Sequence, residues 1–291
     1  MKLSREASLA TVIIYLAKPP RLEELIDGLT KNAAIEYSRL LLEKDARNSF
    51  VKLLSASSID ELDRYIFDIY RSEFEYIGNI LPEEYSYYLY TFLEIYDFEK
   101  LLAISSTPKK ITQPTYMYTN VLNDPQYKQC CRDYSYRCLL EIYIDKTASI
   151  LKKIYRAYLE SYINALNAIA IFTSIRYFIY LKNSHILALA EYSYNEFVKF
   201  INQKLNLSNQ LIVYKLHTIL ENIEKFIRES LDTLEIYEAA YVYDAIKNLL
   251  YPSYQLIDQL TLYLINRYYE QKMIRYVHPL VSSIRGRYRI R

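Results

Sequence analysis

The sequence predicts an all-α protein, and three observations support that prediction. The 291-residue chain contains only 3 Gly and 8 Pro, which is too few for folds built on many tight turns. Neither residue type occurs in the 126 residues between Pro125 and Pro252. One helix of that length would extend about 190 Å, so the segment has to fold back several times. Apolar residues recur there at helical spacing, and no segment of comparable length alternates as a strand does.

The first well-marked helix is expected to begin at Ser58. Ser58 and Glu61 have capping-box spacing, in which the Ser58 side chain accepts from the Glu61 backbone and Glu61 reaches back to Ser58. Gly78 lies where a residue in the left-handed region would end this helix. The apolar positions that the helix is expected to bury are Leu62, Ile66, Ile69 and Ile77.

Proline and polar residues predict the later boundaries. Pro82 suits the first turn of a helix that runs to about Leu102. The segment from Ser105 to Pro125 holds three prolines and is the predicted internal boundary. The long segment without glycine or proline is expected to break at polar clusters, namely Asn183-Ser184, Asn206 through Asn209, and Ser230 through Asp232. A final helix is expected from near Pro252 to before Pro279.

Three segments resemble one another as repeats, namely Tyr88 to Ser105, Tyr162 to Lys182 and Leu260 to Val277. Each is rich in Tyr, Leu and Ile, is apolar first and charged later, and closes a helical block. Repeats at this spacing indicate similar units packed around a shared axis. The chain is therefore divided into a first helical unit (1–106), a Pro-containing connector (107–126), a second unit (127–184), a third unit (185–280) and a basic C-terminal tail (281–291).

The net charge of +2 is small, but the charge is unevenly placed. Residues 58–100 carry eleven acidic and three basic side chains, whereas residues 127–182 carry nine basic and four acidic ones. The last seven residues include four arginines. These segments are either solvated helix faces or surfaces for partners of opposite charge, and the tail is either a solvated end or a contact for an acidic partner.

One apolar segment, Tyr162 to Leu181, has nearly the length of a membrane span. It contains Asn164, Asn167, Ser174 and Arg176, and such side chains are costly in the middle of a bilayer. A buried helix is therefore predicted. The N-terminal segment lacks a small-residue cleavage site and is not interpreted as a signal peptide.

The cysteines and histidines do not predict a metal or redox site. Cys130, Cys131 and Cys138 are an odd-numbered cluster without a fourth zinc ligand nearby, so we expect buried or idle thiols in a reducing compartment. The three histidines, His185, His217 and His278, are scattered, and structural roles are expected for them.

Catalytic signatures are missing from the sequence. No phosphate-binding loop, dinucleotide fingerprint, paired-histidine metal motif or nucleophile elbow occurs. No enzymatic activity, cofactor, metal or small-molecule substrate is therefore expected. The 34 tyrosines could stack nucleobases, but most fall at helical core spacing, which favours core packing with the hydroxyl at the rim.

The third repeat resembles the last helix of the C subunit of archaeal A-type rotary ATPases, which is called d in V-type enzymes. The family pattern is roughly Tyr-Leu-x-x-Lys-Glu-x-Glu-Ile-x-x-Ile-Arg. The matching positions are Tyr263, Leu264, Glu270, Ile274 and Arg275, with Arg267 as a like-charge replacement. Tyr268 departs, because the family usually has its first glutamate there.

The other two repeats resemble the family less closely. Glu94 to Leu102 resembles a family helix that contains an aspartate, here Asp97, but lacks its usual asparagine. In the second repeat, Ile171 stands where the family aspartate would fall. The order of the helices and the division into three blocks are also similar to those of the family, so the resemblance spans most of the chain.

The resemblance implies a funnel of three pseudo-equivalent helical units without catalytic activity. In that family the protein is a socket that couples the central shaft to the membrane proteolipid ring during rotary, ion-driven ATP synthesis. It would lie peripherally on the cytoplasmic face of the membrane, and the Tyr- and Ile-rich, Gly-poor composition also fits a thermophile.

Four residues of the last helix, Tyr263, Arg267, Glu270 and Arg275, are the candidates for partner binding. They would line the socket, or they would lock neighbouring helices through intramolecular ion pairs. The alternative function is a helical nucleic-acid-binding or complex-scaffolding protein that uses surface tyrosines and the basic tail.

Overall fold

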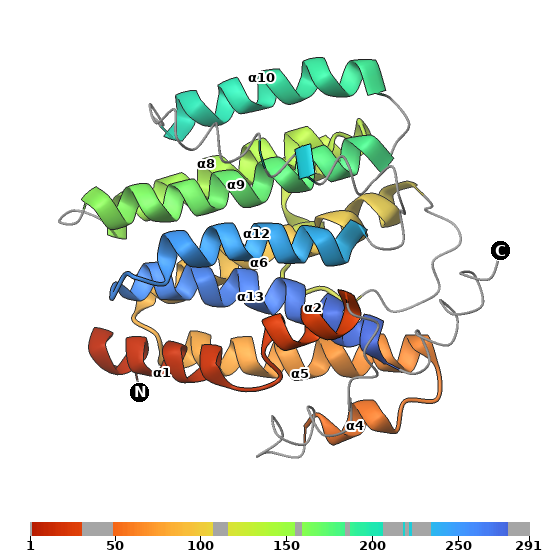
Figure 1. Cartoon of the computed structure of the whole chain (residues 1–291). Helices are drawn as coiled ribbons and strands as arrows, with labels where there is room; N and C mark the ends of the chain where they lie inside the picture. Colours follow the sequence, from red (N-terminus) through yellow and green to blue (C-terminus); the bar gives the residue numbers. More distant parts are fainter. Residues whose placement is uncertain are drawn as a thin grey trace.

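The structure is a computed structural model that describes residues 2–30, 49–106, 116–154, 159–183, 187–205, 218, 221–222 and 234–278. Within these residues it contains helices and no strand, which confirms the all-α prediction. The elements are α1 (Arg5–Ala17), α2 (Leu22–Thr30), α4 (Val51–Leu54), α5 (Ile59–Ile80), α6 (Glu83–Ser106), a 3₁₀ turn (Val121–Asn123), α7 (Pro125–Arg132), α8 (Tyr136–Ile154), α9 (Leu159–Asn183), α10 (Leu187–Leu205), α12 (Leu234–Leu250) and α13 (Leu256–Val277) (Figure 1).

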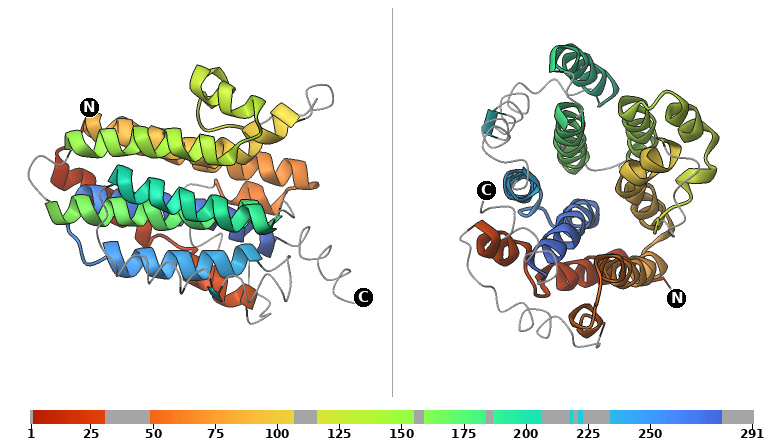
Figure 2. Two further views of the ribbon diagram at one scale, coloured as in Figure 1. Left: turned by 90° about the horizontal axis from the view of Figure 1, so that it is seen from above. Right: turned by 90° about the vertical axis from the view of Figure 1, so that its right-hand side faces the viewer.

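Helix α13 is the centre of the fold. It contacts α1, α2, α5, α6, α9 and α12, while α8 and α10 pack farther out against α9 (Figures 1 and 2). Every residue from Leu256 to Glu270 is buried, so the helix has no solvent-facing side over about four turns. Its polar and charged side chains therefore need partners inside the protein.

The start of α5 follows the predicted cap with one correction. The Ser58 hydroxyl accepts from the Glu61 backbone N–H at 3.2 Å, as expected. The Glu61 carboxylate, however, accepts from the backbone N–H of Ser57 at 2.9 Å and not from Ser58. The four apolar positions predicted to be buried, Leu62, Ile66, Ile69 and Ile77, are buried.

The prediction that Gly78 ends this helix is wrong, because α5 continues to Ile80 and Gly78 does not have a positive φ. A Cβ at this position would lie 2.6 Å from the Tyr90 hydroxyl oxygen. Glycine at this position therefore leaves room for the end of the Tyr90 side chain of α6 and does not form a left-handed turn.

The other predicted boundaries agree with the structure to within a few residues. Helix α6 starts directly after Pro82 and runs four residues past Leu102, and α9 ends at Asn183, as predicted. The last helix begins at Leu256 and ends at Val277. The polar clusters at residues 206–209 and 230–232 and the basic tail lie outside the described residues.

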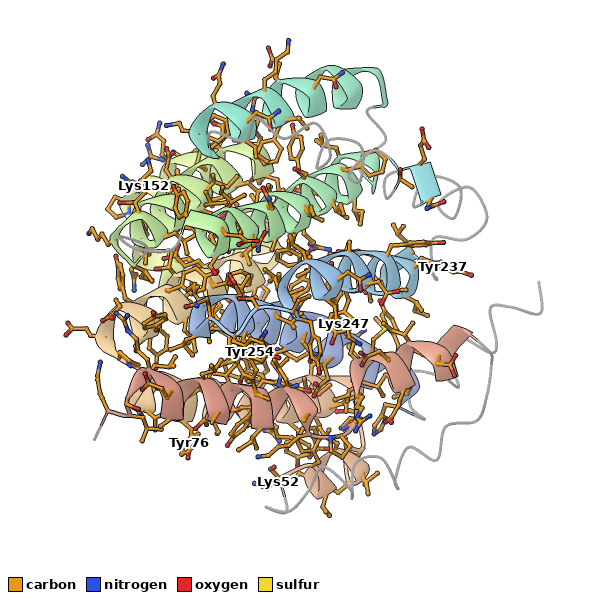
Figure 3. All side chains as sticks on the ribbon, turned by 60° about the vertical axis from the view of Figure 1, so that its left-hand side comes forward. Lys52, Tyr76, Lys152, Tyr237, Lys247 and Tyr254 are labelled. Carbon is orange, nitrogen blue, oxygen red and sulfur yellow. A yellow bond between two sulfur atoms is a disulfide. The ribbon has the colours of Figure 1, made fainter. Side chains whose placement is uncertain are left out.

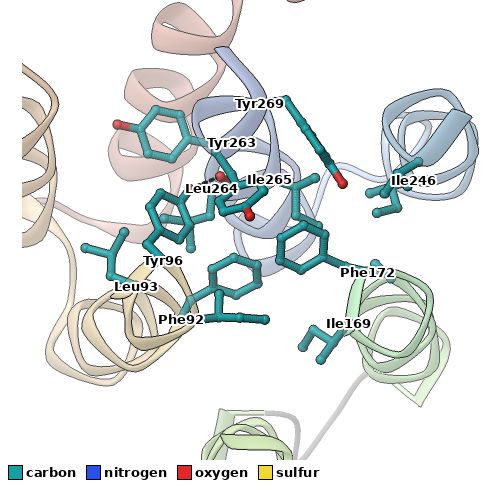
Figure 4. Packing of buried hydrophobic residues seen from close by; sticks show 14 of the residues in the cluster. Phe92, Leu93, Tyr96, Ile169, Phe172, Ile246, Tyr263, Leu264, Ile265 and Tyr269 are labelled. Carbon is teal, nitrogen blue, oxygen red and sulfur yellow. Dashed lines mark hydrogen bonds between the residues drawn. The ribbon is translucent and has the colours of Figure 1, made fainter. Parts of the chain in front are cut away.

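The three repeat segments fall on α6, α9 and α13, and these helices meet in the core (Figure 4). The rings of Phe92 and Phe172 stack with their centroids 6.1 Å apart. Tyr268 then contacts both other helices, at 5.1 Å from Phe172 and 5.0 Å from Tyr96. The helices that carry the internal similarity thus share one aromatic contact region.

The apolar segment on α9 is a core helix, as predicted. By length and composition alone, Glu160–Leu181 could cross a membrane, but 78% of its most apolar window is buried inside the protein. Asn167, Ser174 and Arg176 are buried there as well. The apolar surface of α9 is therefore already used in packing against its neighbours.

Tyrosine is a core residue, but its hydroxyl is not confined to the rim. Seven tyrosines are among the largest fully buried side chains: Tyr70, Tyr88, Tyr127, Tyr143, Tyr177, Tyr263 and Tyr269. The Tyr88 and Thr261 hydroxyls lie 2.7 Å apart, and Tyr269 donates to Glu238 at 3.0 Å. The rim prediction is wrong for Tyr88 and Tyr269, because buried helices carry polar partners for their hydroxyls.

Candidate functional site

Arg267, one of the predicted site residues, is buried where α13 crosses α5 and α1. Its Nε donates to Glu73 Oε1 at 2.5 Å, and Nη2 donates to the backbone oxygen of Tyr15 at 2.5 Å. Nη1 donates to Glu270 and to Asn266 Oδ1. Burial alone would lower the pKa of this guanidinium, but Glu73 and the surrounding groups outweigh burial and raise it. The side chain is therefore a fixed charge that joins three helices.

Tyr263 and Glu270 belong to the same network. The Tyr263 hydroxyl donates to Glu73 Oε1 at 2.8 Å, and Glu270 accepts from Arg267 and from the Tyr70 hydroxyl. Burial, reinforced by the Glu73 charge, raises the pKa of Tyr263 well above its usual value. Of the two roles expected for these residues, their contacts support the locking of neighbouring helices.

Arg275, the fourth predicted residue, lies apart from this network. Its guanidinium Nε donates to Asp63 Oδ1 at 2.7 Å and joins the end of α13 to the start of α5. Burial opposes the charge, but the hydrogen bonds and charge of Asp63 outweigh it and raise the pKa of Arg275. Both side chains of the pair remain partly exposed, so this residue stays accessible to a partner.

A second buried arginine, Arg176 on α9, was not among the predicted site residues. It is bound between Glu238 of α12, at 3.2 Å from both carboxylate oxygens, and Glu99 of α6. Tyr268 of α13 lies beneath it, with the guanidinium carbon 5.3 Å from the ring centroid. The sequence does hold a signal that could have found it. Arg176 is the one basic side chain between Glu160 and Leu181, and a lone charge in an apolar segment needs a buried partner.

Asp97, the aspartate of the first repeat, fixes the second half of the proline-containing connector. It is fully buried and accepts from the backbone N–H groups of Tyr118, at 3.0 Å, and Thr119, at 2.8 Å. The Thr119 hydroxyl adds a third bond at 2.9 Å. Burial raises the pKa of Asp97, although Lys100, at 3.9 Å, and these bonds favour its ionised form. The residue therefore anchors an irregular segment to α6.

A cleft of about 660 Å³ opens between α5, α6, α12 and α13. Its walls combine aromatic rings with both signs of charge. The lining residues are Asp60, Asp63, Ile66, Phe67, Tyr96, Glu99, Lys100, Tyr116, Tyr118, Glu235, Tyr268, Gln271, Lys272, Arg275 and Tyr276. Arg275 is the only predicted site residue in this wall.

Ion pairs hold the charges of the cleft wall. Burial alone would raise the pKa of Glu235, but Lys272, at 3.1 Å, and the Tyr276 hydroxyl outweigh burial and lower it to about 2. Burial lowers the pKa of Lys100, against the opposing charge of Asp97. The cleft thus presents fixed, mixed charges beside aromatic surfaces, which is an arrangement for binding a polar partner segment.

The cysteine prediction needs a correction. Cys130 and Cys138 form a disulfide, with their Cα atoms 5.5 Å apart, and only Cys131 is a buried free thiol. The chain reverses between α7 and α8, with Tyr134 at a φ of 48°, and this turn brings the two sulfurs together. Sequence spacing alone does not reveal such a reversal.

The described residues contain no group of three or more His, Cys, Asp and Glu side chains that could hold a metal ion. His278 Nε2 lies 2.9 Å from the backbone oxygen of Leu53, in the structural role expected for it, and burial lowers its pKa. His185 and His217 lie outside the described residues.

Comparisons with protein-family models, curated proteins and solved structures give no significant match to this chain.

Proposed function

We propose that this chain is a non-catalytic coupling subunit of an A/V-type rotary ATPase, which links the central shaft to the membrane proteolipid ring. The observation that carries the proposal is the meeting of α6, α9 and α13 in one core. These are the segments that resemble one another and the family, and each supplies an aromatic ring to a common contact region.

Buried ion pairs between helices support a mechanical role. Arg267 ties α13 to α5 and α1, and Arg176 ties α9 to α12 and α6. A part that transmits torque has to keep its helices in fixed relative positions. Charge pairs of this kind are costly to separate, because each leaves an uncompensated charge in the interior.

The two ends of the bundle differ, as a part that bridges two partners requires. The cleft, with Arg275, Lys272 and Glu235 in its wall, lies at the C-terminal end of α13. Turns and exposed tyrosines, including Tyr254, form the opposite end (Figure 3). In this proposal the cleft receives a helical end of the shaft, and Arg275 exchanges part of its pairing with Asp63 for a carboxylate of the shaft.

The test is recovery of the full-length chain, with an affinity tag, from detergent-solubilised membranes of its source cells. We expect the proteolipid, the shaft subunits and the nucleotide-binding head to elute with it. A native chain found only in the soluble fraction, free of ATPase subunits, would overturn the proposal.

A cleft variant adds a direct test of the shaft contact. The double variant Arg275→Gln and Lys272→Gln is expected to release the shaft while the fold persists. The matched control, Arg71→Gln, removes an exposed charge from the helix that carries Asp63, at a position outside the cleft. Retention of the shaft by the double variant would mean that the cleft does not bind it, and loss in both variants would mean that the effect is not specific to the cleft.

The nucleic-acid alternative loses support from the burial of the tyrosines. Stacking on bases needs exposed rings, and the fully buried tyrosines, which are part of the core, cannot serve in it. Measurement of single-strand binding at several salt concentrations would decide this alternative, because binding through phosphates weakens steeply with salt.

A further inference from the structure

The end of the molecule opposite the cleft presents exposed tyrosines. Tyr87, on the first turns of α6, is 61% exposed, and Tyr251 and Tyr254, between α12 and α13, are 66% and 84% exposed. Helix α5 ends, α6 begins and α12 turns into α13 at this end (Figures 1 and 3). The Tyr88 and Thr261 hydroxyls, 2.7 Å apart, hold the first turns of α6 and α13 together there. We call the surface formed by Tyr87, Tyr251 and Tyr254 the tyrosine end.

The loop that carries Tyr251 and Tyr254 is held in place by buried side chains of α13. Gln259 Nε2 lies 2.7 Å from the backbone oxygen of Ser253, 3.1 Å from that of Leu250 and 3.4 Å from that of Tyr251. The Ser253 hydroxyl donates to buried Asp258 and accepts from the Gln255 backbone N–H at 3.1 Å. These bonds fix the backbone of a loop whose two aromatic side chains are exposed to solvent, so the loop does not have to become ordered on binding.

Exposed lysines lie at the same end of the molecule as these tyrosines. Lys2 and Lys153 line a shallow groove with Tyr87, and Lys152 is exposed next to Lys153 (Figure 3). Acidic groups at this end are Glu83 and Glu160, which are exposed, and Glu84, which pairs with Arg5 at 3.3 Å. Three exposed lysines therefore lie at this end, and two of them share the groove with Tyr87.

We propose that the tyrosine end contacts a lipid bilayer, with Tyr251, Tyr254 and Tyr87 in the headgroup region and the lysines on anionic headgroups. Tyrosine is suited to this depth, because its ring is apolar and its hydroxyl is polar. Lysine extends an apolar stem and keeps its charge at the headgroups. Two exposed rings on one loop can enter a deformable lipid surface without a preformed pocket, whereas a protein partner would have to supply one.

The proposed ATPase role assigns a second protein partner to this same end, but contact with lipid needs no other subunit. The purified full-length chain can therefore be tested alone. Failure to bind lipid would leave the co-purification test with the ring and shaft unaffected.

The absence of Trp from the chain makes a sharp experiment possible. Tyr254→Trp places a single indole at the tyrosine end, and Leu122→Trp places one at an exposed position on the 3₁₀ turn away from it. Each protein is mixed with vesicles of phosphatidylcholine, with and without phosphatidylglycerol. We expect the emission of the Tyr254→Trp variant to move to shorter wavelength and to be quenched by lipids brominated in the acyl chain, most strongly in the anionic vesicles. The emission of the Leu122→Trp control should stay unchanged.

Vesicle flotation measures the energetic contribution of the rings. The double variant Tyr251→Ser and Tyr254→Ser should lower the partition coefficient on anionic vesicles about tenfold, since partitioning scales with the apolar area inserted. Leu122→Ser is the matched control and should bind as the unchanged protein does. Equal circular dichroism spectra and melting temperatures establish that the serine variants are folded.

Two results would overturn the proposal. One is a chain that does not float with anionic vesicles. The other is binding in which the double serine variant partitions as well as the unchanged protein and the indole of the Tyr254→Trp variant stays in water. A double variant that loses a protein partner, in a chain that never binds vesicles, would assign the tyrosine end to that partner instead.

Discussion

Arg267 and Arg275 lie about two turns apart on α13, and each pairs with a carboxylate of α5. The side chains of Arg267 and its partner Glu73 are 1% and 10% exposed, whereas those of Arg275 and Asp63 are 39% and 40% exposed. Both pairs join a guanidinium to a carboxylate, but only the pair of Arg275 and Asp63 is in contact with solvent to a large extent. The comparison teaches that burial, more than pairing, decides whether such a residue holds the fold or remains available to a partner.

The largest expected effect is at the buried pair. Arg267→Met removes the cation shared by Glu73 and Glu270 and leaves both carboxylates in the interior without it. We expect a loss of about 3–5 kcal/mol in the free energy of unfolding, measured by denaturant titration. Replacing the three charged side chains together, with Glu73→Leu, Arg267→Met and Glu270→Leu, should recover part of the loss, because no charge stays unpaired although the hydroxyls of Tyr70 and Tyr263 lose their acceptors. A single variant as stable as the unchanged protein would show that the network is solvated.

Arg176 tests whether burial also decides the energetic cost of losing an arginine when one of its two partners is exposed. Its side chain is 4% exposed and Glu238 is fully buried, but Glu99 is 48% exposed. Arg176→Met should therefore cost about 3 kcal/mol, at the lower end of the range for a broken buried pair. Glu99→Gln, the control on the exposed side, should cost less than about 1 kcal/mol. Equal losses from both variants would contradict the dependence on burial.

These arginines also show how far sequence reasoning reached. The helical class, the cap at Ser58, the start of α6 after Pro82, and the burial of α9 follow from local patterns and were predicted correctly. Arg267 and Arg275 were singled out by the resemblance of the last helix to the family pattern. Their different burial was not, because Glu73 is 194 residues from Arg267 in the chain and only the fold brings them together.

The errors concern contacts that residue spacing does not reveal. Gly78 was interpreted as a helix end, because its close neighbour Tyr90 on the next helix cannot be inferred from local spacing. The Cys130–Cys138 disulfide depends on the reversal at Tyr134, and the cleft depends on four helices meeting. The disulfide depends on a local turn that residue spacing does not reveal, whereas the cleft depends on contacts between helices far apart in the chain.

Acid titration extends the comparison of buried and exposed ion pairs to Glu235, which is more exposed than Glu73 and less exposed than Asp63. Its pKa falls from the usual 4.5 to about 2 in the folded protein. The unfolded chain therefore takes up this proton first, so the stabilisation by Glu235 is complete above pH 4.5 and is lost as the pH falls toward 2. The stability difference between the unchanged protein and Glu235→Gln should shrink over that range. Asp97, whose pKa is raised, acts in the opposite direction in both proteins and cancels in the difference. A difference that stays constant with pH would contradict the ion pair with Lys272.

The smallest effect on stability is expected at Arg275, where the effect of a substitution on the fold can be distinguished from its effect on binding. Arg275→Gln breaks a partly exposed pair with Asp63 and should change the unfolding free energy by no more than about 1 kcal/mol. If the cleft receives the shaft as proposed, the same substitution weakens that contact by more than it weakens the fold, because the carboxylate of the partner loses its cation in a partly desolvated interface. Denaturant titration and shaft binding, measured on the same protein, show whether binding is weakened more than the fold.

Asp63→Asn serves as the control, because it removes the intramolecular partner and leaves the cation free for the shaft. Parallel losses of stability and binding in both variants would mean that Arg275, like Arg267, only locks the helices.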